Sequence, residues 1–241
     1  MIVRYPLRFI LAAALIAACS PPRGPSAEPP KRRAPSAEPA ERRVPRIIFL
    51  GTSLTAGFGL PDPKMAFPDL IQRKLDSMGL RYQTVNAGVS GETSAGALRR
   101  IGWVLDQGNI AVVMVETGAN DGLRGQDPDS TRANIQAIFD RIRTVNPAPA
   151  LILTGMEAMP NLGRDYTTRF RAIYPELAKA NNAVLIPFML AGVAGIDSLN
   201  QADGIHPTAQ GQELVAATVW KALRPLLTSP SAQRSAPDSL R

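Results

Sequence analysis

The chain has 241 residues, of which 45% are hydrophobic and 20% charged, and it contains one Cys and one His. This length is sufficient for a sizeable hydrophobic core, in one α/β domain or two small domains. One cysteine excludes an internal disulfide framework, and one Cys with one His excludes an ordinary zinc site. The net charge of +7 comes from the ends, because residues 1–46 hold nine Lys or Arg against three Glu, whereas residues 47–225 hold 16 charges of each sign. A neutral body argues against a nucleic-acid partner.

The first 18 residues have the pattern of a secretion signal. Arg4 and Arg8 accompany an apolar run at 9–17, which is too short to cross a bilayer because a span needs about 20 residues. The sequence Ile-Ala-Ala-Cys at 16–19 is similar to the bacterial lipobox, and this resemblance implies a lipid on Cys19. The alternative is a plain secretory peptide cleaved just before an incidental Cys19. We favour a lipoprotein signal peptide at 1–18 and a periplasm-facing protein on the outer membrane of a Gram-negative bacterium.

Residues 19–45 are predicted to form a disordered linker. They are basic and rich in Pro, they contain a near-repeat of Pro-Ser-Ala-Glu-Pro, and they offer little apolar surface to bury. The tail at 226–241 is predicted to be disordered as well. The folded domain is therefore expected at 46–225.

Within this domain, five short apolar runs alternate with five helical patterns. The runs are rich in β-branched residues and lie at 46–50, 82–86, 110–116, 150–156 and 183–187. The helical patterns, with apolar residues at i, i+3, i+4 and i+7, lie at about 67–79, 94–107, 129–145, 165–181 and 207–224. Strands that are apolar on both faces suit a parallel sheet with helical crossovers. The sequence thus predicts a three-layer α/β/α domain with a five-stranded parallel sheet and a ligand site at the carboxyl ends of its strands.

Polar, glycine-containing segments follow the first three predicted strands, at 51–57, 86–96 and 118–125. Each alone is explained equally well by turn chemistry, and the first also by a phosphate-binding loop of the kind that holds FMN. The segment 203–208, before the last helix, contains the one histidine. A carboxylate at Asp203 can reach Nδ1 of His206 on one tight turn, which leaves Nε2 free to take a proton from a serine hydroxyl.

Four blocks together resemble the SGNH (GDSL) hydrolases: Gly51-Thr-Ser-Leu, Gly88, Gly118-x-Asn-Asp and Asp203-x-x-His. Further segments from 46 to 225 are most similar to the bacterial periplasmic thioesterase/arylesterase/lysophospholipase branch. The resemblance implies a flavodoxin-like SGNH hydrolase fold and a serine hydrolase that uses no cofactor and no metal. It implies Ser53 as the nucleophile, His206 as the base and Asp203 as the orienting carboxylate. The oxyanion hole would comprise the N–H groups of Ser53 and Gly88 and the side-chain amide of Asn120.

The chain departs from the family pattern at three positions. Thr52 replaces the family Asp before the nucleophile, and Thr117 and Ala119 replace the commoner Leu and Gly before Asn120. We expect Thr52 to change loop geometry or substrate preference more than chemistry, and Ala119 to sit where the backbone angles are unusual. Asp121 is expected to brace the Asn120 loop, and the alternative is a role as a second acid or base. Met156 and Tyr166, after the fourth strand, are expected to flank an acyl pocket or to pack in the core.

The predicted function is hydrolysis of esters or thioesters with short- to medium-chain acyl groups through an acyl-enzyme, as in arylesterases, acyl-CoA thioesterases and lysophospholipases. The expected partners are a small acyl substrate and, through Cys19, the membrane. One alternative is a carbohydrate O-acetylesterase, because the same blocks serve both reactions. Two others are a flavodoxin-like FMN-binding protein and a catalytically silent envelope binding protein. The low aromatic content and the Asp203–His206 pair argue against the former, and the joint presence of Ser53, Asn120, Asp203 and His206 against the latter.

Overall fold

The computed structural model describes residues 44–145 and 148–227. The predicted signal peptide, Cys19, most of the linker and nearly all of the predicted tail lie outside the described residues. In the part of the chain that is described, no helix is both long enough and apolar enough to cross a membrane.

Five parallel strands form the central sheet in the order β2-β1-β3-β4-β5. The strands are β1 (Arg46–Gly51), β2 (Gln83–Gly88), β3 (Ile110–Val115), β4 (Ala150–Thr154) and β5 (Val184–Ile186). Phe49 of β1 is in register with Asn86 of β2 on one side and Met114 of β3 on the other. Both β1 and β3 are buried over almost their whole length, which explains why their apolar residues do not alternate with polar ones.

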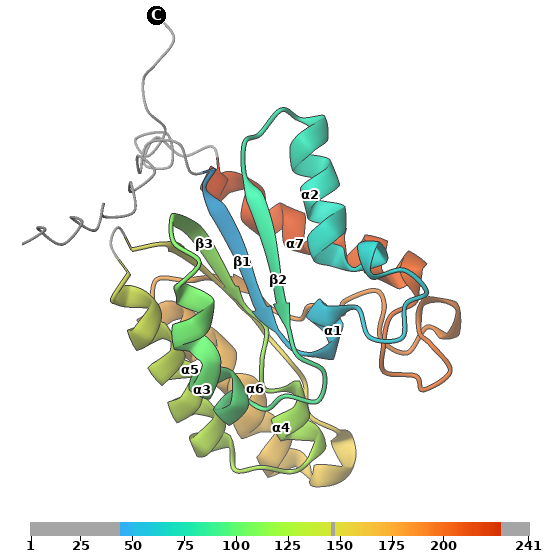
Figure 1. Ribbon diagram of the computed structural model, residues 1–241. Helices are drawn as coiled ribbons and strands as arrows, with labels where there is room; N and C mark the ends of the chain where they lie inside the picture. Colours follow the sequence, from blue (N-terminus) through green and yellow to red (C-terminus); the bar gives the residue numbers. More distant parts are fainter. Residues whose placement is uncertain (1–43, 146–147, 228–241) are drawn as a thin grey trace, which may run out of the picture. The chain divides into compact units, whose positions relative to one another are not determined.

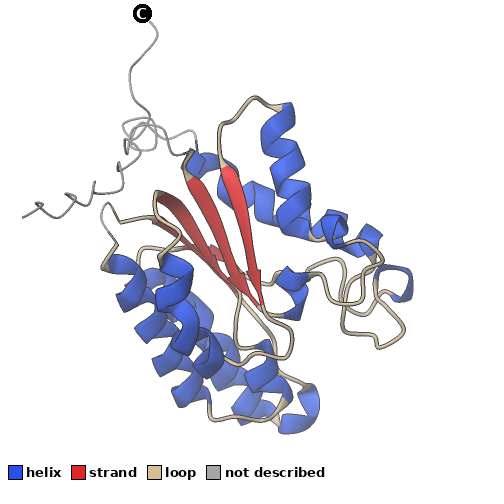
Figure 2. Cartoon of the chain, in the orientation of Figure 1, coloured by secondary structure: helices blue, strands red, loops and turns tan. Residues whose placement is uncertain are grey.

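Helices cover both faces of the sheet (Figures 1 and 2). On one face lie α2 (Phe67–Ser77) and α7 (Ala209–Leu227), and on the other α3 (Ser94–Leu105), α5 (Pro128–Arg143) and α6 (Arg164–Ala180). Each helix turns an apolar stripe to the sheet; in α5 this stripe consists of the fully buried Ile135, Ile138, Phe139 and Ile142. The rings of Phe49 and Phe67 meet edge-to-face between β1 and α2, with centroids 5.2 Å apart. The predicted three-layer α/β/α fold is confirmed.

The five strands and five long helices end within three residues of their predicted positions. The largest difference is at the end of α7, which continues through Pro225 to Leu227. A proline in the last turn removes only one helical hydrogen bond, so the helix need not stop there. The short helices α1 (Ser53–Ala56) and α4 (Ala119–Leu123) and the 3₁₀ helices η2 (Pro63–Met65), η3 (Pro160–Leu162) and η4 (Asp197–Leu199) were not predicted. They are too short to show a period.

The strand order changes direction at β1, because β2 lies on one side of it and β3 on the other. The chain leaves β1 through α2 on one face and returns from β2 to β3 through α3 on the other face. The segments that follow β1 and β3 therefore diverge at the carboxyl edge of the sheet, where α1 and α4 lie (Figure 1). Ligand sites of open α/β sheets occur at such points.

Candidate active site

Ser53 is the first residue of α1, within a turn at 51–56 that we call the Ser53 turn. A Cβ atom at Gly51 would lie 2.5 Å from Thr55 Cβ and 2.7 Å from Glu116 Oε2, so no side chain fits there. Gly57 closes α1 in the left-handed conformation, with φ of 72°. The turn thus presents a half-buried Ser53 directly at the carboxyl end of β1.

Ser53, His206 and Asp203 form one hydrogen-bonded chain. The Nδ1 atom of His206 donates to Asp203 Oδ2 over 2.6 Å, and its Nε2 atom lies 2.9 Å from Ser53 Oγ. Because the proton of the neutral ring is on Nδ1, Nε2 is the acceptor for the serine hydroxyl. The side chain of His206 is 18% exposed and Ser53 is half-buried, so solvent reaches both residues. The fold therefore brings together the three residues predicted for the triad.

A tight turn before α7 holds the Asp203 carboxylate. Its Oδ1 accepts the backbone N–H groups of Ile205 and His206 over 2.9 and 3.0 Å, and Gly204, which directly follows Asp203, has φ of 72°. The hydrogen bonds from the His206 backbone, the His206 ring and the Ile205 backbone lower the pKa of Asp203 to about 2. Asp203 is therefore an anion at neutral pH and accepts the hydrogen bond from the His206 ring.

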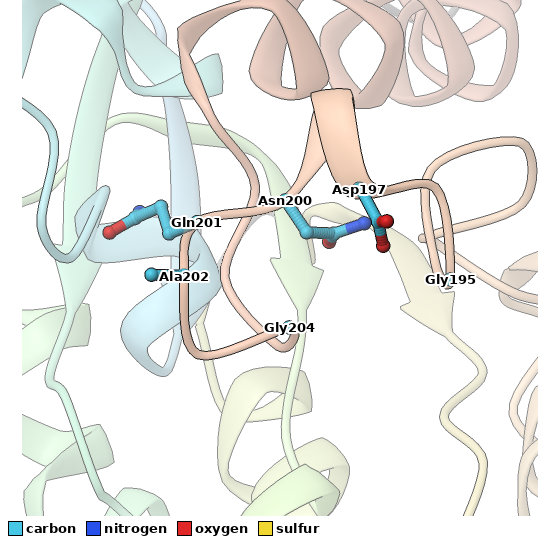
Figure 3. Close-up of a pocket in the computed structure, with 6 residues that line it drawn as sticks. All are labelled: Gly195, Asp197, Asn200, Gln201, Ala202 and Gly204. Carbon is cyan, nitrogen blue, oxygen red and sulfur yellow. The ribbon is translucent and has the colours of Figure 1, made fainter.

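Two amide side chains brace the loop that carries Asp203 and His206. Gln201 Nε2 donates to the carbonyls of Phe58 and Pro207 over 2.7 and 3.0 Å, which ties this loop to the chain after α1. Asn200 Nδ2 donates to two carbonyls at the start of the loop, over 2.6 and 2.9 Å. Both residues line a cavity of about 220 Å³ together with Gly195, Asp197, Ala202 and Gly204 (Figure 3). None of the side chains of Ser53, His206 and Asp203 lines this cavity, so it lies beside the hydrogen-bonded triad.

Asn120 lies in α4, at the carboxyl end of β3. Its Nδ2 atom donates one hydrogen to the Glu92 carbonyl over 3.0 Å, and the second hydrogen of the amide remains for a ligand. The unusual backbone of this segment is at Gly118, with φ of 100°, where a Cβ would contact the Tyr174 hydroxyl. The expectation of unusual angles at Ala119 was wrong, because the glycine one residue earlier takes the positive φ.

Gly88 does not fit its predicted role in an oxyanion hole. Its N–H donates to Asn86 Oδ1 over 3.0 Å and so has an acceptor within the protein. A Cβ at Gly88 would lie 2.7 Å from Ala56 Cα, so the glycine is needed for close packing against the Ser53 turn. Gly91 follows in the same loop, at φ of 76°, and its N–H has no acceptor among the described residues. The hydrogen bonds, the packing and the backbone angles distinguish these two glycines, and their spacing in the sequence does not.

Asp121 braces the Asn120 loop, as predicted. The carboxylate is fully buried and accepts the backbone N–H and the hydroxyl of Ser94 over 2.8 and 2.5 Å. It therefore anchors α4 to the first turn of α3. With both oxygens engaged in this way, Asp121 has no role as a second acid or base.

Glu116 is the residue of this region that the sequence analysis missed. It follows β3 directly, is 1% exposed, and accepts hydrogen bonds from Thr52 and Thr55. Burial raises its pKa to about 7, although the hydrogen bonds from both threonines oppose the shift. In the sequence, the signal that could have identified Glu116 is its position as a carboxylate directly after an apolar strand. Thr52, which stands where the family has Asp, fits this site because its hydroxyl donates a hydrogen bond to Glu116.

Comparison with known proteins agrees with this geometry. Residues 49–214 match the model of the GDSL-like Lipase/Acylhydrolase family. The chain belongs to this family. Esterase TesA of Pseudomonas aeruginosa is 36% identical over 75% of this chain and 89% of its own length. Thioesterase 1/protease 1/lysophospholipase L1 of Escherichia coli K12 is 37% identical over 77% of this chain and 86% of its own length.

A solved structure extends the likeness to the fold. The crystal structure of the psychrotrophic esterase EstA from Pseudoalteromonas sp., inhibited by monoethylphosphonate, matches with a TM-score of 0.71 and 31% identity, covering 76% of this chain and 99% of that one. The predicted SGNH (GDSL) family, its fold and the assignment of the chain as an ester-hydrolysing enzyme of that family are confirmed.

Proposed function

We propose that this protein hydrolyses carboxylic esters and thioesters of short- to medium-chain acyl groups through an acyl-enzyme on Ser53. The observation that carries the proposal is the hydrogen-bonded chain from Ser53 Oγ through His206 to the Asp203 carboxylate. A serine hydroxyl, an imidazole and a carboxylate in this order are the groups that a catalytic triad uses for acyl transfer. The names of the relatives, which include an esterase and a thioesterase, support the same substrate classes.

In the first half of the reaction, Ser53 Oγ attacks the carbonyl carbon while His206 Nε2 takes the hydroxyl proton. The resulting imidazolium is stabilised by Asp203 and returns the proton to the alcohol or thiol, which leaves as the acyl–Ser53 ester forms. In the second half, His206 takes a proton from water, the hydroxide attacks the acyl carbon, and the acid leaves as Ser53 regains its proton. The chemistry is balanced with water as the one co-reactant.

Three N–H groups are proposed to stabilise the oxyanion of each tetrahedral intermediate. One is the second hydrogen of the Asn120 amide, which its bond to Glu92 leaves available. The second is the backbone N–H of Ser53, a donor in the first turn of α1 that has no intrahelical partner. The third is the backbone N–H of Gly91, which we assign to this role in place of Gly88. The N–H of Gly91 has no acceptor among the described residues, whereas that of Gly88 already donates to Asn86.

Exposed apolar side chains beside the triad favour acyl chains over sugars. The Phe58 ring is 50% exposed, with its centroid 4.7 Å from that of His206, and Ile205 is 43% exposed. Val89, Leu123 and Met159 are also exposed, in the segments that follow β2, β3 and β4 at the carboxyl edge of the sheet. Apolar side chains gathered at a site edge mark a surface for an apolar ligand.

The test is a hydrolysis series with p-nitrophenyl esters of increasing chain length, acyl-CoA and acetylated sugars, using Ser53→Ala as the control. We expect the highest kcat/KM with short- to medium-chain acyl groups and its loss in Ser53→Ala. A fluorophosphonate probe should phosphonylate Ser53 with loss of fluoride and add the mass of the phosphonyl group to the peptide that contains it. Preference for acetylated sugars would replace this proposal by a carbohydrate O-acetylesterase, and hydrolysis no faster than that of Ser53→Ala would overturn it.

We further propose that the enzyme faces the periplasm and is tethered to the outer membrane by a lipid on Cys19. The support is the lipobox-like sequence at 16–19 and the Pro-rich linker that separates it from the domain. Cys19→Ser should move the protein from the membrane fraction to the soluble periplasm or leave an unprocessed precursor. Unchanged fractionation, with no lipid mass on the mature N-terminus, would rule out the anchor.

A further inference from the structure

A buried carboxylate lies beneath the Ser53 turn and takes no part in the mechanism above. Glu116 Oε2 accepts the backbone N–H of Thr52 over 2.7 Å and the hydroxyl of Thr55 over 2.8 Å. Its Oε1 accepts the hydroxyl of Thr52 over 2.8 Å. All three donors come from the six residues that carry Ser53. Such charge-assisted bonds in a buried setting are stronger than neutral ones.

Three charged or titratable groups approach this region from neighbouring helices. Arg100 of α3 pairs with Glu92 and donates to the Gly51 carbonyl over 3.2 Å. Asp121 of α4 is engaged by Ser94. Tyr174 of α6 donates to the Thr117 carbonyl over 3.1 Å, and burial raises its pKa well above the ordinary value, with smaller contributions from Asp121 and Glu116. None of the three forms a hydrogen bond or ion pair with the Glu116 carboxylate in the described structure. The Ser53 turn alone supplies its partners.

We propose that Glu116 is a positioning residue of the hydrolase, whose carboxylate fixes the Ser53 turn and whose protonation loosens it. The anion accepts all three donors at once. In the neutral acid, Oε1 becomes a donor and faces the Thr52 hydroxyl, whose own hydrogen then has only the longer contact to Oε2, at 3.1 Å. Oε2 already accepts the Thr52 N–H and the Thr55 hydroxyl, so the turn is held less tightly. Because Thr52 directly precedes Ser53, a shift there displaces both Ser53 Oγ and the Ser53 N–H. The inference rests on the proposed function, since it concerns the same nucleophile.

This arrangement has a consequence for the pH dependence of activity. Burial raises the pKa of Glu116 to about 7, so the carboxyl changes state near neutral pH. Full activity then requires that both Glu116 and His206 are deprotonated. At acid pH, log(kcat/KM) should rise with a slope approaching about two, where the triad alone gives about one.

Glu116→Gln tests the charge at nearly constant shape. We expect kcat to fall by about 10- to 100-fold, because small displacements of a nucleophile have effects of this size, while KM changes little. The acid limb of its pH profile should retain a slope of about one, from His206 alone. Thr154→Val is the matched control: it removes another buried hydroxyl, from β4, that donates to the Val115 carbonyl and not to Glu116. It should keep the wild-type pH profile.

A second pair of variants tests the hydrogen bond itself. Thr52→Val removes the hydroxyl donor but keeps the N–H, which should raise the pKa of Glu116 further and move the corresponding step of the profile to higher pH. Thr52→Ser restores a hydroxyl donor and should bring that step back. A purely structural Thr52 would lower stability in Thr52→Val without moving the profile. The ¹³C resonance of the Glu116 carboxyl, identified by its absence in Glu116→Gln, should titrate with the same midpoint as the kinetic step.

The outcomes separate this inference from the proposed function. If wild type is no more active than Ser53→Ala, the proposed function is wrong, and the inference falls with it. If wild type is active and folded Glu116→Gln keeps its kcat and its two-step profile, only the inference is overturned. It is overturned equally if the Glu116 carboxyl does not titrate between about pH 5 and 9, or if Thr52→Val leaves the kinetic step in place.

Discussion

At the scale of single residues, the one histidine makes the triad assignment sharply testable, because no second imidazole can replace it. His206→Ala should lower kcat nearly as much as Ser53→Ala, by on the order of 10⁶, and the double mutant should be no worse than either. Asp203→Ala should lower kcat by on the order of 10⁴, since Asp203 orients the ring and transfers no proton. The measurement is kcat for each purified variant, with circular dichroism to confirm folding. A folded His206→Ala enzyme that keeps about a tenth of the wild-type rate would contradict the mechanism, because that loss is only about 1.4 kcal/mol.

Asn120 has two roles that kinetics can separate. One hydrogen of its amide holds the Glu92 carbonyl, and the other is proposed to meet the oxyanion. Asn120→Ala should lower kcat by about 10²–10³ with little change in KM, because the oxyanion forms only in the transition state. Steady-state kinetics and thermal unfolding, measured together, distinguish this loss from a loosened loop. A normal kcat with a raised KM would assign Asn120 to substrate binding alone.

The three residues predicted for the triad are hydrogen-bonded to one another in the structure, and their positions in the sequence explain why they could be proposed. Asp203 and His206 lie on one turn, and Ser53 follows a strand directly, so topology alone brings them to one edge. The choice between Gly88 and Gly91 depends on which N–H already has an acceptor, and only coordinates show that Asn86 takes the first. Glu116 is hidden for a related reason, because its partners Thr52 and Thr55 lie 64 and 61 residues away along the chain.

At the scale of elements, long periodic segments were predictable and short ones were not. The core strands β1 and β3 are apolar on both faces, and α5 shows a full helical period, so each carries its own signal. In contrast, α1 has four residues and α4 has five, too few for any periodicity. These two short helices carry Ser53 and Asn120. The sequence therefore predicted the scaffold closely and the backbone of the site poorly.

One buried side chain of α7 connects three of these elements. Gln212 is 1% exposed; its Oε1 accepts the Phe67 N–H at the start of α2, and its Nε2 donates to the Leu54 carbonyl in α1. Gln212→Ala leaves both backbone groups buried without partners, which should lower the free energy of unfolding by about 2–5 kcal/mol. Gln210→Ala, at an exposed position of the same helix, is the matched control and should change it by less than about 0.5 kcal/mol. Urea unfolding of both variants checks this; equal stabilities would contradict the proposed connection.

At the scale of the whole molecule, residues 47–225 carry equal numbers of positive and negative charges. Individual groups with shifted pKa values, and not repulsion from a net charge, should therefore govern the pH dependence of stability. Asp203 and Glu116 act in opposite directions. The pKa of Asp203 is lowered to about 2, so its stabilising contribution is fully present above the ordinary carboxyl range and is lost only as the pH falls toward 2. It is constant from pH 5 upward. Glu116 is the described carboxyl whose large shift spans the range between pH 4.5 and 7.

The burial of Glu116 should therefore make the folded enzyme less stable as the pH rises to neutrality. Between pH 4.5 and about 7 the unfolded chain has lost the Glu116 proton while the folded protein still binds it. The free energy of unfolding should fall across this window, with a slope of up to about 1.4 kcal/mol per pH unit, and level off above it. In Glu116→Gln this component of the slope is absent, whatever constant offset the amide introduces. Urea unfolding of wild type and Glu116→Gln at intervals from pH 5 to 8 measures the difference, and parallel curves would show that Glu116 titrates alike in both states. A difference would mean that the enzyme keeps an ionised carboxylate beneath its nucleophile at the expense of stability, the usual direction of such conflicts at active sites.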